Sequence, residues 1–210
     1  NTINAATTGV VTVASTTITG SAADVATTYA ANTAGTIAGL GDEAVSVSGS
    51  SAAASDLNAI DTATSGVVTV ASTTITGSYG DVLITYNANT AGTIAGLGNE
   101  AITLSSTNTV DQLNTIAGKT TGVVTATISD NDMSTLDGIT ESGHALTISV
   151  TDSSVAASNL NTLDGKTTVT VAVSSSTITG SAADVATTYA AQGSTISGLG
   201  DEAVSISGAS

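Results

Sequence analysis

The sequence predicts a repeat solenoid: a β-rich parallel β-solenoid with a short helical segment in each coil. Three observations favour this fold class. A strand-like triplet returns eight times, long segments repeat almost unchanged, and large aromatic residues are nearly absent. The chain of 210 residues contains four Tyr but no Phe, Trp, Pro or Cys. A core that contains mainly Val, Ile, Leu and Ala must be thin, and a stack of coils has such a core.

The recurring triplet consists of a Ser or Thr, an aliphatic residue and a second Ser or Thr. In a strand, its alternation places the aliphatic side chain on one face and both hydroxyls on the other. We therefore expect the hydroxyls to form an outward ladder on stacked coils. The sixteen candidate members are Thr17, Thr19, Ser46, Ser48, Thr74, Thr76, Thr103, Ser105, Thr127, Ser129, Thr147, Ser149, Thr177, Thr179, Ser205 and Ser207.

Two modules alternate along the chain. The first occupies residues 9–35 and returns at 66–92 with only five substitutions. The second occupies residues 35–50 and returns at 92–107 and 194–209. Repetition of this kind indicates units that stack on their neighbours.

We expect about eight coils in a single elongated solenoid over residues 1–210, because the triplet occurs eight times. Strand–helix–strand crossovers are nearly always right-handed, so we expect a right-handed stack. The approximate coils are 1–35, 36–66, 67–92, 93–122, 123–143, 144–168, 169–193 and 194–210.

Each coil has three expected parts: a β-prone run, the triplet and a short helix. The helix signal is a capping box, in which Ser21 caps a turn and Asp24 follows three residues later, near the free amides. Helices of two to three turns that are rich in Thr are unstable alone, so neighbouring coils must hold them. The same spacing occurs at Ser78 with Asp81 and at Ser181 with Asp184.

Charge and hydropathy exclude several classes of function. The formal net charge is −15, from 17 acidic and 2 basic residues, so nothing here can neutralise nucleic-acid phosphates. No run of about 18 apolar residues occurs, so we expect no membrane insertion. Both ends of the sequence fall inside partial coils. We therefore expect a segment of a longer array, or a subunit whose ends the next copy covers.

Several units resemble known repeats. Asp56-Leu57-Asn58-Ala59-Ile60-Asp61, residues 158–168 and residues 36–45 resemble repeats of giant secreted or cell-surface proteins of marine cyanobacteria and related bacteria. The resemblance covers most of the chain. It implies an extracellular or cell-surface location and a structural or adhesive role. Proteins of that kind are sometimes described as calcium-binding, but the glycine–aspartate nonapeptide that would carry such a site is missing here.

Two classes of function remain open. In the first, the chain is a structural protein that self-associates end to end or laterally, as a filament, sheath or surface-layer component, or that forms an adhesin stalk. In the second, the outward Ser/Thr ladder binds an extracellular surface such as ice, mineral or glycan. Serine at many ladder positions breaks a uniform Thr plane, which favours the first class.

Residues that could support chemistry are few, so we expect no enzyme and no cofactor. His144 is the only His, and no catalytic partner set is apparent around it. Asp130, Asn131 and Asp132 are the best local candidates for calcium, although no complete calcium loop is present. A solvated acidic surface explains them more simply. Lys119 and Lys166 each follow Gly in a Gly-Lys-Thr-Thr turn.

Overall fold

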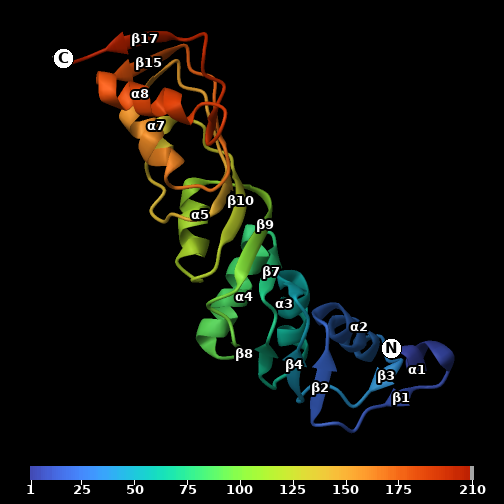
Figure 1. The fold of residues 1–210 in the computed structure, drawn as a ribbon. Coiled ribbons are helices and arrows are strands. Elements are labelled where there is room, and N and C mark those ends of the chain that lie inside the picture. Colours follow the sequence, from blue (N-terminus) through green and yellow to red (C-terminus); the bar gives the residue numbers. More distant parts are fainter. Residues whose placement is uncertain (209–210) are drawn as a thin grey trace. The chain divides into compact units, whose positions relative to one another are not determined.

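The computed structural model describes residues 1–208, in which eight helices alternate with 17 strands (Figure 1). The helices are α1 (Thr2–Ala6), α2 (Ala22–Thr33), α3 (Ala54–Ala63), α4 (Tyr79–Ala91), α5 (Val110–Ala117), α6 (Met133–Leu136), α7 (Ala157–Asp164) and α8 (Ala182–Ala191). The first nine strands are β1 (Val11–Thr12), β2 (Thr17–Gly20), β3 (Ile37–Ala38), β4 (Ala44–Val47), β5 (Ser51–Ala53), β6 (Val68–Val70), β7 (Thr74–Gly77), β8 (Ile94–Ala95) and β9 (Ala101–Asn108). The others are β10 (Val124–Ile128), β11 (Ala145–Thr147), β12 (Ser149–Val150), β13 (Ser154–Ala156), β14 (Val171–Val173), β15 (Thr177–Gly180), β16 (Ile196–Ser197) and β17 (Ala203–Ile206).

The predicted fold class, a β-rich parallel β-solenoid of about eight right-handed coils, is wrong. The strands are short and form several small parallel sheets, while helices of up to 13 residues alternate with them. This pattern is an α/β fold. The helices are longer and contribute more to the interior than the Thr-rich sequence suggested, because packing against neighbours compensates for weak intrinsic helix propensity.

The capping pattern does mark the start of three helices. Ser21 precedes α2, and its hydroxyl accepts a hydrogen bond from the backbone N–H of Asp24 at 3.2 Å. Ser78 and Ser181 cap α4 and α8 in the same way. At the other end of α4, Gly92 adopts the left-handed conformation, with φ of 87°, and terminates the helix.

The first compact unit comprises Asn1–Ser105 and Lys119–Gly122. Its strands pair in parallel in the orders β1-β3, β2-β4-β6-β8 and β5-β7-β9. Helix α3 packs against both α2 and α4. Equivalent strands pair in equivalent register: Ile18 lies opposite Val45, and Ile75 lies opposite Ile102.

The second compact unit comprises Ser106–Gly118 and the chain from Val123 onward. Its strands pair in the orders β10-β11, β12-β14-β16 and β13-β15-β17. Helix α7 packs against α8, and Ile178 lies opposite Val204, as in the first unit. Strand β17 is the outer strand of its sheet.

Helices and strands both supply the interior. Leu57 and Ile60 of α3 and Ile75 of β7 are fully buried, and Tyr86 of α4 is 2% exposed. Over the described residues, no helix is both long and apolar enough to cross a membrane.

Candidate functional site

The hydroxyl triplets lie at the surface. None of the sixteen Ser and Thr residues is buried, and the central aliphatic residue is buried in most triplets. The two exceptions are Ile18 of β2, which is half-buried, and Ile206 of β17, which is 52% exposed. Both strands are the outermost strands of their sheets.

The register of the strands interrupts the expected ladder. Thr19 lies opposite Ser46, but Thr17 lies opposite Ala44. Ser46 then pairs with Thr69 of β6, which is not part of a triplet. The structure therefore pairs ladder residues with one another at separate positions: Thr19 with Ser46, Thr76 with Thr103, Thr127 with Thr147, and Thr179 with Ser205. Thr74 and Thr177 lie opposite Ser51 and Ser154, which are outside the triplets.

A Tyr–Glu pair joins each of the helices α2, α4 and α8 to the second module, and the pair is buried in the first unit. The Tyr29 hydroxyl of α2 donates to Glu43 Oε2 at 3.0 Å, and the Tyr86 hydroxyl of α4 donates to Glu100 Oε2 at 2.7 Å. Tyr189 and Glu202 pair in the same way in the second unit. The two glutamates of the first unit are only 2% and 3% exposed.

The ionisation of the first pair is fixed by its surroundings. Burial, followed by the nearby Glu43 carboxylate, raises the pKa of Tyr29 to about 12. Burial also acts to raise the pKa of Glu43, but hydrogen bonds from backbone N–H groups, Gly41 first among them, and from Tyr29 outweigh it and lower that pKa. A neutral phenol therefore donates to a carboxylate throughout the neutral range.

A corner of the following repeat covers each pair in the first unit. Thr64 donates to the backbone carbonyl of Glu43 at 2.7 Å, and Gly66 N–H donates to Thr64 Oγ1 at 3.0 Å. A Cβ on Gly66 would lie 2.2 Å from the Glu43 oxygen, so only glycine fits. Residues 120–122 cover Glu100 in the same manner, with Thr120 donating to the Glu100 carbonyl at 2.6 Å.

An asparagine links neighbouring helices. Asn58 of α3 donates through Nδ2 to the Asp81 carbonyl of α4 at 3.0 Å and accepts from Thr85 Oγ1 at 2.7 Å. Asn161, Asp184 and Thr188 repeat both contacts between α7 and α8. Asn1 makes the same pair of contacts with Asp24 and Thr28.

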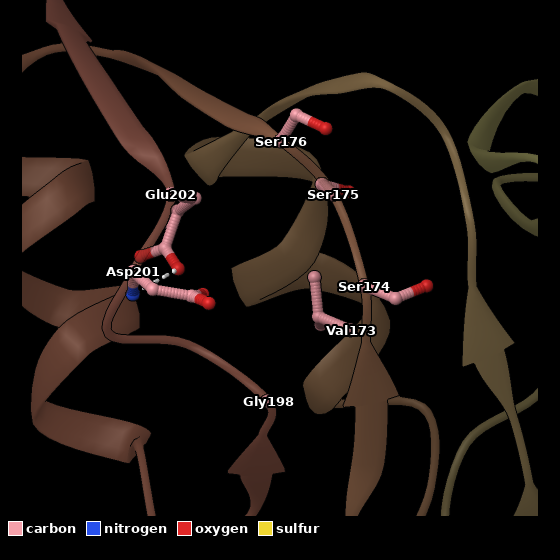
Figure 2. Close-up of a pocket in the computed structure, with 7 residues that line it drawn as sticks. All are labelled: Val173, Ser174, Ser175, Ser176, Gly198, Asp201 and Glu202. Carbon is pink, nitrogen blue, oxygen red and sulfur yellow. Dashed lines mark hydrogen bonds between the residues drawn. The ribbon is translucent and has the colours of Figure 1, made fainter.

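The second unit has an open groove between two successive loops (Figure 2). Residues 173–176, with Gly198, Asp201 and Glu202, line about 420 Å³ of space. We call these residues the groove. In Figure 2 the Asp201 carboxylate points into the gap between the two loops, and the Ser174 hydroxyl points away from it.

His144 occupies a corner position with a structural role. It is 7% exposed, and its Nδ1 accepts from the Val124 N–H at 3.2 Å. Thr167 serves the same purpose in the next repeat, where its Oγ1 accepts from the Leu146 N–H at 2.9 Å. Burial lowers the pKa of His144, although nearby Glu141 opposes this shift.

The local candidates for calcium serve different parts of the fold. Asp130 accepts from the Val110 N–H at 2.7 Å at the start of α5. Asp132 caps α6, and hydrogen bonds from Ser134, then Thr135, lower its pKa. Within residues 1–208, no group of three or more His, Cys, Asp or Glu residues is placed to hold a metal ion. Lys166 donates to the Thr140 carbonyl at 3.0 Å.

No protein-family model, curated protein or solved structure matches the chain. Function must therefore be argued from the geometry. The sequence interpretation singled out the triplets and missed the residues that join the repeats. Their signal was present as Glu43 and Glu100, each 14 residues after a Tyr, and as the recurring Thr-[Ser/Thr]-Gly corner.

Proposed function

We propose that the protein is a structural component of the extracellular space or the cell surface and works by stacking and self-association. The observation that carries this proposal is the contact between successive repeats. It recurs with the same strand register, the same Tyr–Glu pair and the same Thr-Gly corner. Tyr29, Thr64 and Glu43 of this contact are hydrogen-bonded to one another, as expected of groups that hold repeats together.

The charge supports a role in saline surroundings. A net charge of −15 keeps copies apart at low ionic strength and is screened at high ionic strength. The location outside the cell is supported by the resemblance of residues 56–61 and their counterparts to repeats of giant bacterial surface proteins.

Binding to ice, mineral or glycan through the Ser/Thr ladder has weaker support. A binding face of that kind needs an uninterrupted row, but Ala44 and Ala101 lie opposite Thr17 and Thr74. Separate pairs of hydroxyl residues are better explained as part of an exposed, polar strand surface than as a binding face.

Electron microscopy of the purified chain at several protein concentrations tests the proposal. The ionic strength should span about 0.01 M to about 1 M, because the Debye length falls from about 30 Å to about 3 Å over that range. We expect oligomers or fibres that grow with both protein and salt. Separate single particles under all conditions would overturn self-association.

A further inference from the structure

Strand β17 and the groove expose residues that are buried elsewhere in the repeat. Val204 and Ile206 are 46% and 52% exposed, whereas their counterparts Val45 and Val47 are 1% and 0% exposed. The sequences around the two strands are nearly identical, so the difference lies in what covers them. In the first unit the cover is the segment 64–70.

Backbone contacts seat that segment on the preceding repeat. Ser65 N–H donates to the Gly41 carbonyl at 2.8 Å, and Val45 N–H donates to the Val67 carbonyl at 3.0 Å. Strand β6 then pairs with β4, with Ser46 opposite Thr69. Together with the Thr64 corner, these contacts bury the Val45 and Val47 side chains.

The chain carries a second version of the covering segment, and this version is exposed. Residues 7–13 read TTGVVTV and residues 64–70 read TSGVVTV, a single difference. Gly9 N–H donates to Thr7 Oγ1 at 3.0 Å, which is the corner conformation seen at Thr64 and Gly66. Val11 and Val13 are half-buried, whereas their counterparts Val68 and Val70 are 0% and 4% exposed.

We propose that residues 7–13 of one copy of this chain dock onto β17 and the groove of a second copy. The docked segment takes the register of residues 64–70 on residues 41–47, so Thr12 lies opposite Ser205. Thr7 donates to the Glu202 carbonyl, and Thr8 N–H donates to the Gly200 carbonyl. This inference rests on the proposed function, because it names the surfaces through which self-association occurs.

The chemistry of the two surfaces fits this pairing. The docking segment is uncharged, so it places no carboxylate against Asp201 and Glu202. Its Val11 and Val13 cover the aliphatic face that Val204 and Ile206 expose. The two surfaces are unlike each other, so the contact is heterologous, and each added copy leaves one free surface of each kind.

Gly9→Ala tests the contact, with sedimentation velocity as the readout. In the isolated chain, the only neighbour of a Cβ at Gly9 is Thr7 Oγ1 at 3.5 Å, and the φ of Gly9 is not positive, so the fold tolerates alanine. In the docked state that Cβ would approach the Glu202 carbonyl as closely as the 2.2 Å found at Gly66. We expect association to weaken by roughly 10- to 100-fold, as for overpacking at a close contact.

Gly80→Ala is the matched control. Gly80 lies in α4, where a Cβ meets only Ser78 Oγ at 3.9 Å, far from both docking surfaces in sequence. This variant should associate like the unaltered chain. Circular dichroism of both variants should match that of the unaltered chain.

A mixing experiment tests the direction of the contact. Val204→Lys should block the groove side while leaving residues 7–13 intact. At a protein concentration at which the unaltered chain assembles and each variant alone is monomeric, an equimolar mixture of Gly9→Ala and Val204→Lys should form one-to-one heterodimers that do not grow further. Assembly of Gly9→Ala equal to that of the unaltered chain would overturn this docking but leave self-association standing. An unaltered chain that stays monomeric would overturn both.

Discussion

At the scale of single residues, the Tyr–Glu pairs place a carboxylate in the interior, where a charge is costly unless hydrogen bonds satisfy it. Glu43 receives hydrogen bonds from Tyr29 and from the Gly41 N–H at 2.8 Å. Glu100 receives them from Tyr86 and from the Gly98 N–H at 2.9 Å. The pairs join the long helix to the loop that follows it, and so they fix where the next strand begins.

Tyr86→Phe should lower the free energy of unfolding by about 1–3 kcal/mol, because it removes a donor from a buried carboxylate. Urea unfolding followed by circular dichroism measures the loss. The control is Tyr79→Phe, since Tyr79 is half-buried and its hydroxyl makes no hydrogen bond among residues 1–208. Equal stability of the two variants would contradict the structural role of the Tyr–Glu pair.

His144 makes stability depend on pH in a defined window. Its pKa in the folded chain is below the ordinary value of 6.5, so the unfolded chain takes up the proton at higher pH than the folded chain does. Stability should therefore fall as pH drops below 6.5, with a slope below about 1.4 kcal/mol per pH unit for one proton. Protonated Nδ1 could no longer accept from the Val124 N–H.

His144→Thr should remove this pH dependence, because Thr167 shows that threonine accepts a backbone N–H at the equivalent corner. Urea midpoints of both proteins from about pH 7.5 to about pH 5 provide the comparison. Glu141 is the charged group that opposes the shift and is retained in both. A parallel decline in the two proteins would assign the pH dependence to other groups.

At the scale of elements, side-chain hydrogen bonds hold neighbouring helices together. Asn58→Ala removes two of these bonds between α3 and α4, while the Asp81 carbonyl keeps the hydrogen bond from Thr85 Oγ1 at 2.9 Å. We expect a loss of about 1–3 kcal/mol in the free energy of unfolding. Asn87→Ala, at an exposed position of α4, is the control and should be nearly neutral. Equal losses in the two variants would show that the Asn58 contacts add no stability.

The sequence was a good guide to where helices begin and a poor guide to strand register. Ser21 and Asp24 predicted the start of α2 because a capping box acts within four residues. Register depends on distant contacts. If β2 were shifted along β4 by one residue, Ile18 would face outward. A shift of two residues keeps Ile18 inward, so the alternating pattern permits Ile18 opposite either Val45 or Val47. The Tyr29–Glu43 pair joins the helix after β2 to the residue before β4, and it favours Val45.

At the scale of the whole molecule, composition predicted a repetitive, aliphatic interior but misjudged the fold class. Because aromatic residues are few, the sequence suggested a thin core in which strands lie close to one another on every side. The helices instead bring Leu57, Ile60 and Tyr86 into the interior, with at most 2% of each side chain exposed. Thr lowers intrinsic helix propensity, and the contacts that overcome it join residues 23 to 31 positions apart, which local sequence patterns do not reveal.

A pair of cysteines tests the central claim that a second copy continues the strand pairing. The chain has no native Cys, and directly opposite residues of paired strands are about 4.8 Å apart, within disulfide range. Thr12→Cys combined with Ser205→Cys should give covalently linked oligomers under mild oxidation. Thr12→Cys combined with Ser207→Cys, two residues out of register, should give far fewer. Equal linkage in both proteins, or none in either, would contradict the account.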